Sequence, residues 1–145
     1  MLFGYTTGVF DMFHIGHLRI LEQAKAECDQ LIVGITTDEL SLSEKGGRPI
    51  VPFYERRQIV SALRCVDLTV PQTSMDKRQA WESLRFDRMF VGDDWRGTPR
   101  WNALEREFAD LGVEIVYFPY TIHTSSTLLR RALDGMVSAP EAARA

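Results

Sequence analysis

Short runs of apolar, β-prone residues alternate along this chain with longer amphipathic runs. The short runs cover residues 2–7, 30–36, 67–70, 88–91 and 113–118. The longer runs cover residues 54–64, 76–84, 100–111 and 125–133, and an earlier one begins near residue 17. Strands that alternate with helices are typical of βα units that build a parallel sheet. The pattern therefore predicts a single α/β domain over residues 1–134, a Rossmann-like three-layer α/β/α sandwich with a five-stranded parallel sheet.

The amphipathic runs show where their helices face the sheet and where they stop. In the first run the apolar positions recur at spacings of three and four: Leu18, Leu21, Ala24 and Cys28. This spacing puts them on one face of a helix, which we expect to pack on the sheet. Gly112 and Gly135 are placed as stop signals for later helices. Residues 135–145 lose the hydrophobic periodicity and are expected to form a disordered tail.

Composition narrows the class of protein. The chain has 145 residues, of which 45% are hydrophobic and 26% charged, enough for one globular core. Its net charge of −3 gives no general attraction for nucleic acid or for an anionic membrane. We expect a cytoplasmic protein, because neither a secretory signal nor a membrane-spanning segment is evident. Cys28 and Cys65 form no Cys-x-x-Cys pair, so neither a disulfide framework nor a cysteine metal site is expected.

The loop at residues 8–17 carries the candidate chemistry. It follows the first predicted strand and delivers His14 and His17 to the mouth of the first helix. A helix N-terminus offers unpaired N–H groups and a positive dipole end, both suited to a phosphate. The two imidazoles add directional donors, and Gly16 between them removes a side chain that would hold a phosphate away. The loop is suited to binding an α-phosphate.

A metal site is the alternative interpretation of the same loop. Histidines at this spacing can bind zinc, and Asp11 could join His14 and His17 as a ligand. Such a site needs three or four ligands, and the neighbouring sequence supplies no further one.

The motifs of the chain resemble those of a known family. Gly8-x-Phe10-Asp11-x-x-His14-x-Gly16-His17 is similar to the signature loop of the cytidylyltransferase-like nucleotidyltransferases. Within this family the chain is most similar to the glycerol-3-phosphate cytidylyltransferases. That similarity rests on the segments at residues 36–39, 54–57, 63–67, 92–95 and 125–127, in matching order over residues 4–133.

The resemblance implies an activity. CMP would pass from CTP to an alcohol phosphate by direct in-line attack, giving a CDP-alcohol and pyrophosphate. Mg²⁺ would arrive with CTP rather than in a dedicated protein cage. Members of the family are commonly dimers, so the resemblance also implies a homodimer.

The resemblance also implies roles for individual residues. The catalytic residues would be His14, His17 and Lys45. The nucleotide would be bound by Gly8, Val9, Phe10, His14, Gly16, His17, Arg64, Asp94, Tyr120, Thr121, Ser126 and Thr127. The acceptor would be bound by Asp11, Lys45, Lys77 and Arg78. Lys45 is expected on a flexible loop after the second strand, where Arg48 could take its part.

Several points stay open at the level of sequence. The carboxylates of Asp93 and Asp94 could accept from the cytosine amine, bind Mg²⁺ or cap the next turn. Tyr120 stands where the glycerol-3-phosphate enzymes carry an arginine, so another cation is needed to compensate or the acceptor differs. The candidate cations are Arg96, Arg100 and Arg130. An ATP-dependent adenylyltransferase and a non-catalytic nucleotide-binding module remain the alternative functions.

Overall fold

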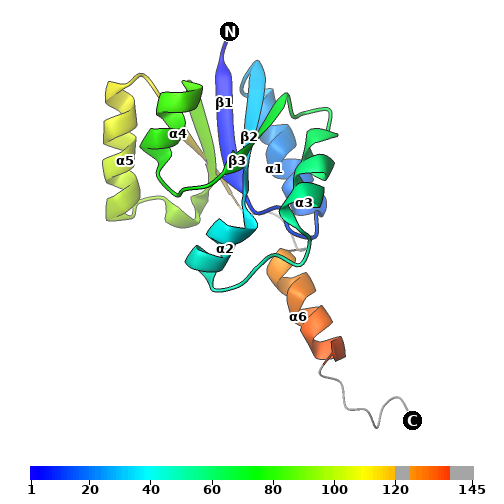
Figure 1. Cartoon of the computed structure of the whole chain (residues 1–145). Helices are drawn as coiled ribbons and strands as arrows, with labels where there is room; N and C mark the ends of the chain where they lie inside the picture. The colour runs from blue at the N-terminus through cyan, green and yellow to red at the C-terminus, as the bar shows by residue number, and fades with distance from the viewer. Residues whose placement is uncertain (120–124, 138–145) are drawn as a thin grey trace, which may run out of the picture.

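The predicted architecture is confirmed by a computed structural model, which describes residues 1–119 and 125–137 (Figure 1). Five parallel strands lie in the order β3-β2-β1-β4-β5. Their bounds are β1 Phe3–Gly8, β2 Gln30–Thr36, β3 Leu68–Gln72, β4 Arg88–Gly92 and β5 Glu114–Phe118. The helices are α1 Ile15–Ala26, α2 Asp38–Lys45, α3 Phe53–Ser61, α4 Lys77–Leu84, α5 Pro99–Asp110 and α6 Ser126–Val137, with a short 3₁₀ turn, η1, at Asp93–Trp95.

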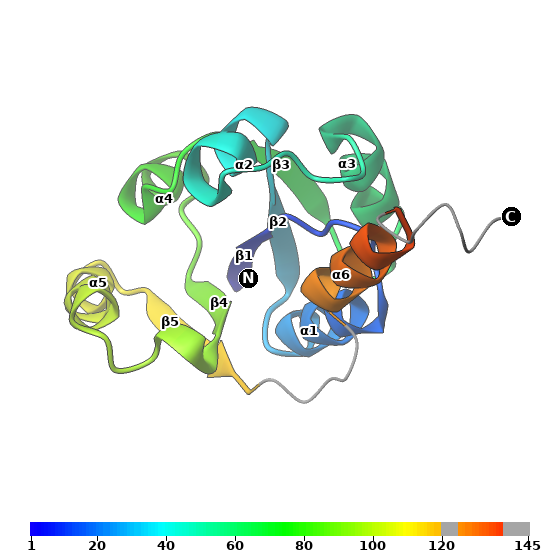
Figure 2. The same cartoon turned by 90° about the horizontal axis from the view of Figure 1, so that it is seen from below.

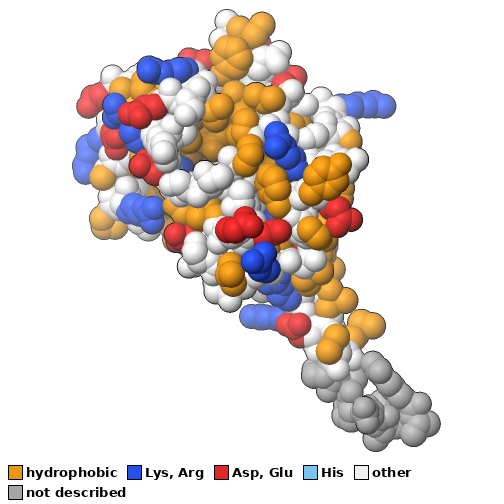
Figure 3. All heavy atoms as spheres, viewed as in Figure 1, with side chains coloured by type: hydrophobic (Ala, Val, Ile, Leu, Met, Phe, Trp, Pro, Cys, Tyr) orange, Lys and Arg blue, Asp and Glu red, His pale blue; other side chains and the backbone are white. Residues whose placement is uncertain are grey.

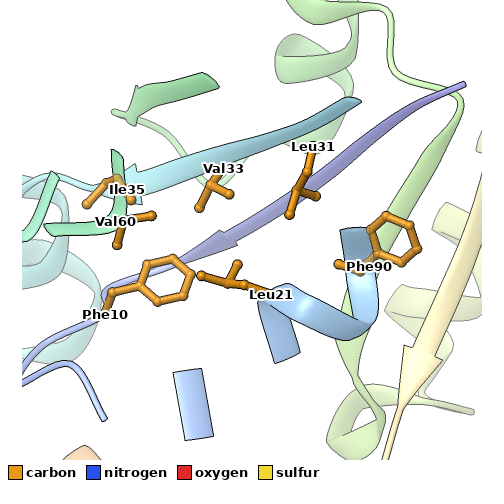
Figure 4. Packing of buried hydrophobic residues seen from close by; sticks show 8 residues of the cluster. Phe10, Leu21, Leu31, Val33, Ile35, Val60 and Phe90 are labelled. Atoms are coloured by element: carbon orange, nitrogen blue, oxygen red, sulfur yellow. The ribbon is translucent and has the colours of Figure 1, made fainter. Parts of the chain in front are cut away.

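Helices cover both faces of the sheet, so the strands in its centre are apolar on both sides. On one face, α1 and α3 pack on a core that includes Phe10, Leu21, Val33 and Val60, shown from close by in Figure 4. On the other face, α4 and α5 enclose a second core built on Tyr5, Ile32, Phe86, Met89 and Phe108. The sheet and the helices on its two faces form three layers. The continuous apolar runs of the strands had indicated this, because strands covered on both faces are apolar on both sides.

The helix α2 was not expected from the sequence, and its existence corrects the placement of Lys45. Thr37 caps its start by accepting from the Leu40 N–H, and Gly46 ends it in the left-handed region at φ 74°. Lys45 is therefore the last residue of a helix and not part of a flexible loop. The segment was missed because it is mostly polar, and only Leu40 and Ser41 of it are buried.

The last helix also differs from its prediction. Gly135 does not stop it, and α6 continues to Val137. Glycine inside a helix costs only about 1 kcal/mol relative to alanine, which is too little to end a helix by itself. In Figure 1 α6 projects away from the sheet beyond its carboxyl edge. The remaining part of the expected tail, residues 138–145, lies outside the described residues.

The surface carries both signs of charge. On the face shown in Figure 3, lysine and arginine side chains alternate with aspartate and glutamate and form no continuous basic area. Among the described residues, no helix is long and apolar enough to cross a membrane.

Candidate active site

The loop between β1 and α1 has an unusual backbone. Phe10 and Met12 adopt positive φ angles of 54° and 49°, which side-chain-bearing residues seldom do. The Phe10 ring folds back over Gly8, where an added Cβ would lie 2.8 Å from its Cε2 atom. Such backbone conformations persist only when the surrounding contacts enforce them, and they cluster at functional sites. The loop is therefore held in one shape before any ligand arrives.

The two histidines cap α1 reciprocally. His14 Nδ1 accepts from the Gly16 N–H at 3.0 Å, and His17 Nδ1 accepts from the His14 N–H at 3.3 Å. A neutral imidazole has one donor and one acceptor nitrogen, so an accepting Nδ1 places the proton on Nε2. Both rings therefore present an Nε2–H group as a hydrogen-bond donor. Among the described residues, the buried Nε2 of His14 has no partner.

The environment keeps both rings neutral. Their centroids are 3.9 Å apart in a stacked arrangement, and Phe10 lies edge-on against His17 at 5.3 Å. Burial lowers the pKa of His17 to about 4, with a further contribution from His14, while Asp11 acts in the opposite direction. Burial also lowers the pKa of His14. At neutral pH the pair can donate two hydrogen bonds to phosphate oxygens without carrying charge.

This arrangement predicts the titration of His17. In ¹⁵N-labelled protein, its ring nitrogens should keep the signature of the neutral Nε2–H form from pH 8 down to about 5 and titrate near pH 4. Because the folded-state pKa lies below the unfolded value, this group's contribution to stability is complete above pH 6.5. It is then lost as the pH falls toward 4. A titration midpoint near 6.5, the ordinary value, would show instead that the ring is solvated and the reciprocal cap open.

Asp11 holds the loop in place. Its buried carboxylate accepts from the N–H groups of Ile50 and Val51 at 2.8 and 2.9 Å and from Arg130 Nη2 at 2.9 Å. Both oxygens are thus engaged by the protein itself, so the structure gives Asp11 a positioning task. This differs from the acceptor-binding task expected from the sequence, and also from the metal-binding alternative. The described residues contain no group of three or more His, Cys, Asp or Glu side chains arranged to hold a metal.

Arg56 is the functional residue that sequence reasoning missed. Its side chain is 1% exposed and bonds to three separate segments of the chain. It donates to the carbonyl oxygens of Val9, Thr36 and Val51 at 2.6, 2.8 and 2.8 Å, and to Asp38 Oδ1 at 2.7 Å. The first loop, the end of β2 and the start of α2 are therefore fixed by one guanidinium. One sequence feature could have revealed it. Arg56 lies four residues before the apolar Val60, and this spacing places both side chains on the buried face of α3.

The start of α6 lies against the histidine loop. Ser126 Oγ donates to the Asp11 carbonyl at 2.6 Å and lies 3.5 Å from His17 Nε2. Arg130, one turn further along, contacts Asp11 and the carbonyl of Arg48. Burial and the positive charge of Arg130 lower the pKa of Lys45. Lys45 therefore lies within the electrostatic influence of Arg130, whose guanidinium is itself paired with Asp11.

The remaining nucleotide-binding candidates do not all lie near the histidines. Asp94 lies in η1, exposed at the carboxyl edge of the sheet that Figure 2 views end-on. Thr127 is exposed on the first turn of α6. Arg64 lies in the turn after α3 and lines a groove with Lys25, which pairs with Asp67 near the start of β2. The structure therefore does not bring Arg64 to the histidines. Tyr120 and Thr121 lie outside the described residues.

The two acceptor-binding candidates on α4 point in different directions. Lys77 Nζ reaches Thr7 Oγ1 at the end of β1, at 3.4 Å, and burial followed by the charge of Arg100 lowers its pKa to about 8. Arg78 instead pairs with Glu107 at 3.0 Å and with Glu82 at 3.5 Å. Only Lys77 joins the site.

Comparison with known proteins agrees with this geometry. A family model described as cytidylyltransferase-like matches residues 5–132. The chain belongs to the cytidylyltransferase-like family. It is 33% identical over 132 residues to glycerol-3-phosphate cytidylyltransferase of Bacillus subtilis, covering 90% of this chain and 96% of that protein. It is 32% identical over 118 residues to FAD synthase of Thermococcus sibiricus, covering 79% and 78% of the two chains.

A solved structure shows the same fold for this cytidylyltransferase-like chain. The lipopolysaccharide core biosynthesis protein of Thermoplasma volcanium superposes with a TM-score of 0.70 at 24% identity, over 86% of this chain and 99% of that one. Family membership supports a transferase, and the histidine loop lies where this fold collects its ligands, at the carboxyl ends of the strands.

Proposed function

We propose that this protein transfers CMP from CTP to a small alcohol phosphate, with glycerol 3-phosphate as the preferred acceptor. The observation that carries the proposal is the pair of neutral, stacked histidines that present Nε2–H donors at a helix N-terminus, the one on His14 without a partner among the described residues. The similarity to glycerol-3-phosphate cytidylyltransferase along nearly its whole length supports the donor and the acceptor.

The chemistry follows from these donors. An oxygen of the acceptor phosphate attacks the α-phosphorus of CTP and forms a new P–O bond. The bond from that phosphorus to the α–β bridging oxygen breaks, and its electron pair leaves with pyrophosphate. The attacking oxygen is already anionic, so no general base is required, and catalysis rests on positioning and charge stabilisation. His14 and His17 donate to the non-bridging oxygens as negative charge develops there.

Other residues hold the substrates. Lys45 and Arg130 supply positive charge for the β- and γ-phosphates, and Ser126 lies next to His17 at the start of α6. Asp94 is proposed to accept from the exocyclic amine of cytosine. Mg²⁺ is proposed to enter with the triphosphate and to neutralise its charge, because this ion is usually held by substrate phosphates and few protein groups.

Pyrophosphate release tests this function. Purified protein is incubated with Mg²⁺, with CTP or ATP, and with a panel of alcohol phosphates that includes glycerol 3-phosphate. We expect release that requires CTP, Mg²⁺ and the acceptor together, with a CDP-alcohol as the product. Release with ATP and none with CTP would instead support adenylyl transfer, the alternative favoured by the similarity to FAD synthase, whose product contains an adenine nucleotide.

A further inference from the structure

Lys77 and Arg100 stand at the starts of two helices at the carboxyl edge of the sheet, where the charge of Arg100 helps to lower the pKa of Lys77. Lys77 begins α4, and Arg100 lies in the first turn of α5. The one hydrogen bond of Lys77 Nζ within the described residues is the long contact to Thr7 Oγ1 at 3.4 Å. Arg100 has no hydrogen bond or ion pair among those residues. The neighbouring Asp76 uses its carboxylate to cap α4 at the Gln79 N–H.

Among the described residues, no carboxylate forms an ion pair with Lys77 or Arg100. Burial and the nearby guanidinium disfavour the charged form of Lys77, and no carboxylate opposes them. The first turn of α5 has no acidic residue and its N-cap, Thr98, is neutral, so the dipole of α5 adds further positive potential. A partly buried ammonium beside a guanidinium is unfavourable unless an anion completes the arrangement. The glutamates of this helix pair do not neutralise Lys77 and Arg100, since Glu82 and Glu107 pair with Arg78.

We propose that Lys77 and Arg100 together bind the phosphate group of the acceptor, and that Arg100 is a specificity-determining residue of the reaction. This inference rests on the proposed function and goes beyond it by replacing Arg78, the arginine suggested by sequence, with Arg100. A phosphate monoester carries close to two negative charges, which two cations match, and an arginine fork can bind two of its oxygens.

The position of the pair favours the acceptor over the triphosphate. In phosphoryl transfer the attacking and leaving oxygens lie roughly in line on opposite sides of the phosphorus. Lys45 and Arg130 gather on the side of α6, where they suit the leaving pyrophosphate. Lys77 and Arg100 come from α4 and α5, on the other side of β1 in the end-on view of Figure 2. An acceptor phosphate held there would approach from the side that in-line attack requires.

Steady-state kinetics test the assignment, with glycerol 3-phosphate as the acceptor and CTP as the donor. Arg100→Ala should raise the KM for glycerol 3-phosphate about 10- to 100-fold, the effect of losing a charged hydrogen-bonding partner. The KM for CTP should stay unchanged, and Arg100→Lys should restore part of the acceptor affinity. The matched control is Arg78→Ala, which removes an arginine from the same helix pair and should leave the acceptor KM unchanged.

A pH profile separates binding from a structural effect. In the wild type, kcat/KM for the acceptor should fall as Lys77 loses its proton above about pH 8. In Arg100→Ala that fall should move to higher pH, because the repulsion from the guanidinium is gone. A variant that only loosened the fold would not shift the profile in this way.

The outcomes separate this inference from the proposed function. If the wild type turns over CTP but Arg100→Ala keeps its KM for glycerol 3-phosphate, the assignment is overturned and CMP transfer stands. If the wild type releases no pyrophosphate with any acceptor, the function fails, and titration calorimetry with glycerol 3-phosphate alone decides the anion site. Binding that is lost in Arg100→Ala and kept in Arg78→Ala supports the site. Absent binding, or equal binding in both variants, overturns it.

Discussion

His17→Ala is expected to lower kcat for CMP transfer by about 10²- to 10³-fold, the usual cost of removing one preorganised donor to a developing oxyanion. The His17 Nε2–H group is desolvated and neutral, so it suits the extra charge that the α-phosphate oxygens carry in the transition state. An interaction that strengthens only in the transition state affects turnover more than substrate binding. Single-turnover kinetics with saturating CTP and glycerol 3-phosphate measure the effect.

The dissociation constant of CTP is the control for this variant. We expect it to change much less than the rate, because the cations of Lys45 and Arg130 remain in place. A thermal unfolding scan checks that the loop still folds without the contacts between His17 and the rings of Phe10 and Phe13. Unchanged turnover would remove His17 from the chemistry. An unmodified protein that binds CTP and turns over with no acceptor would favour the non-catalytic nucleotide-binding module.

Arg56→Ala is expected to destabilise the fold by about 3–5 kcal/mol, the range found when one partner of a buried ionic network is deleted. The substitution deprives three backbone carbonyl oxygens and Asp38 Oδ1 of this donor, at a position where the Arg56 side chain is buried. For a domain of this size the melting temperature should fall on the order of 10–15 °C. Urea unfolding followed by circular dichroism gives the free energy directly.

The adjacent Arg57 provides a matched control for that measurement. Within the described residues its guanidinium bonds only to Thr69, at 3.2 Å to Oγ1 and 3.0 Å to the carbonyl, so Arg57→Ala should cost about 1 kcal/mol. Equal losses from both substitutions would mean that Arg56 has no special part in joining the loops. Arg56→Lys should recover little, because an ammonium cannot reproduce the fork that serves four acceptors.

The sheet and its layers could be predicted from the sequence, because the apolar periods of strands and helices are set by burial in a parallel sheet. The helix α2 could not, since its stability comes from the Thr37 cap and the Gly46 end rather than from an apolar face. The same holds within the site. His14 and His17 were evident from their rarity and spacing, whereas the buried Arg56 reads as one more polar residue of an amphipathic helix.

The residues proposed to bind the acceptor show more clearly what sequence alone cannot predict. Lys77 and Arg78 are adjacent in the chain, and nothing in their order tells which one faces the site. Only the packing of α4 against β1 sends Lys77 toward Thr7 and leaves Arg78 to the glutamates. Arg100 is distant from both in the sequence and meets Lys77 because α5 follows β4, the neighbour of β1 in the sheet. The order of the strands in the sheet brings these two residues close, and the local sequence around either residue does not reveal that order.

The reciprocal cap of α1 restricts which side chain can stand at position 14. One edge of the ring accepts the Gly16 N–H where the helix starts, while the proposed function requires the other edge to offer a hydrogen to the ligand. Imidazole is the one natural side chain with an acceptor and a donor on opposite edges of a rigid ring. Folding of the helix therefore selects the protonation form that the proposed reaction needs. The tautomer of His14 is fixed when the first turn of α1 forms. No further side chain is needed to orient the ring.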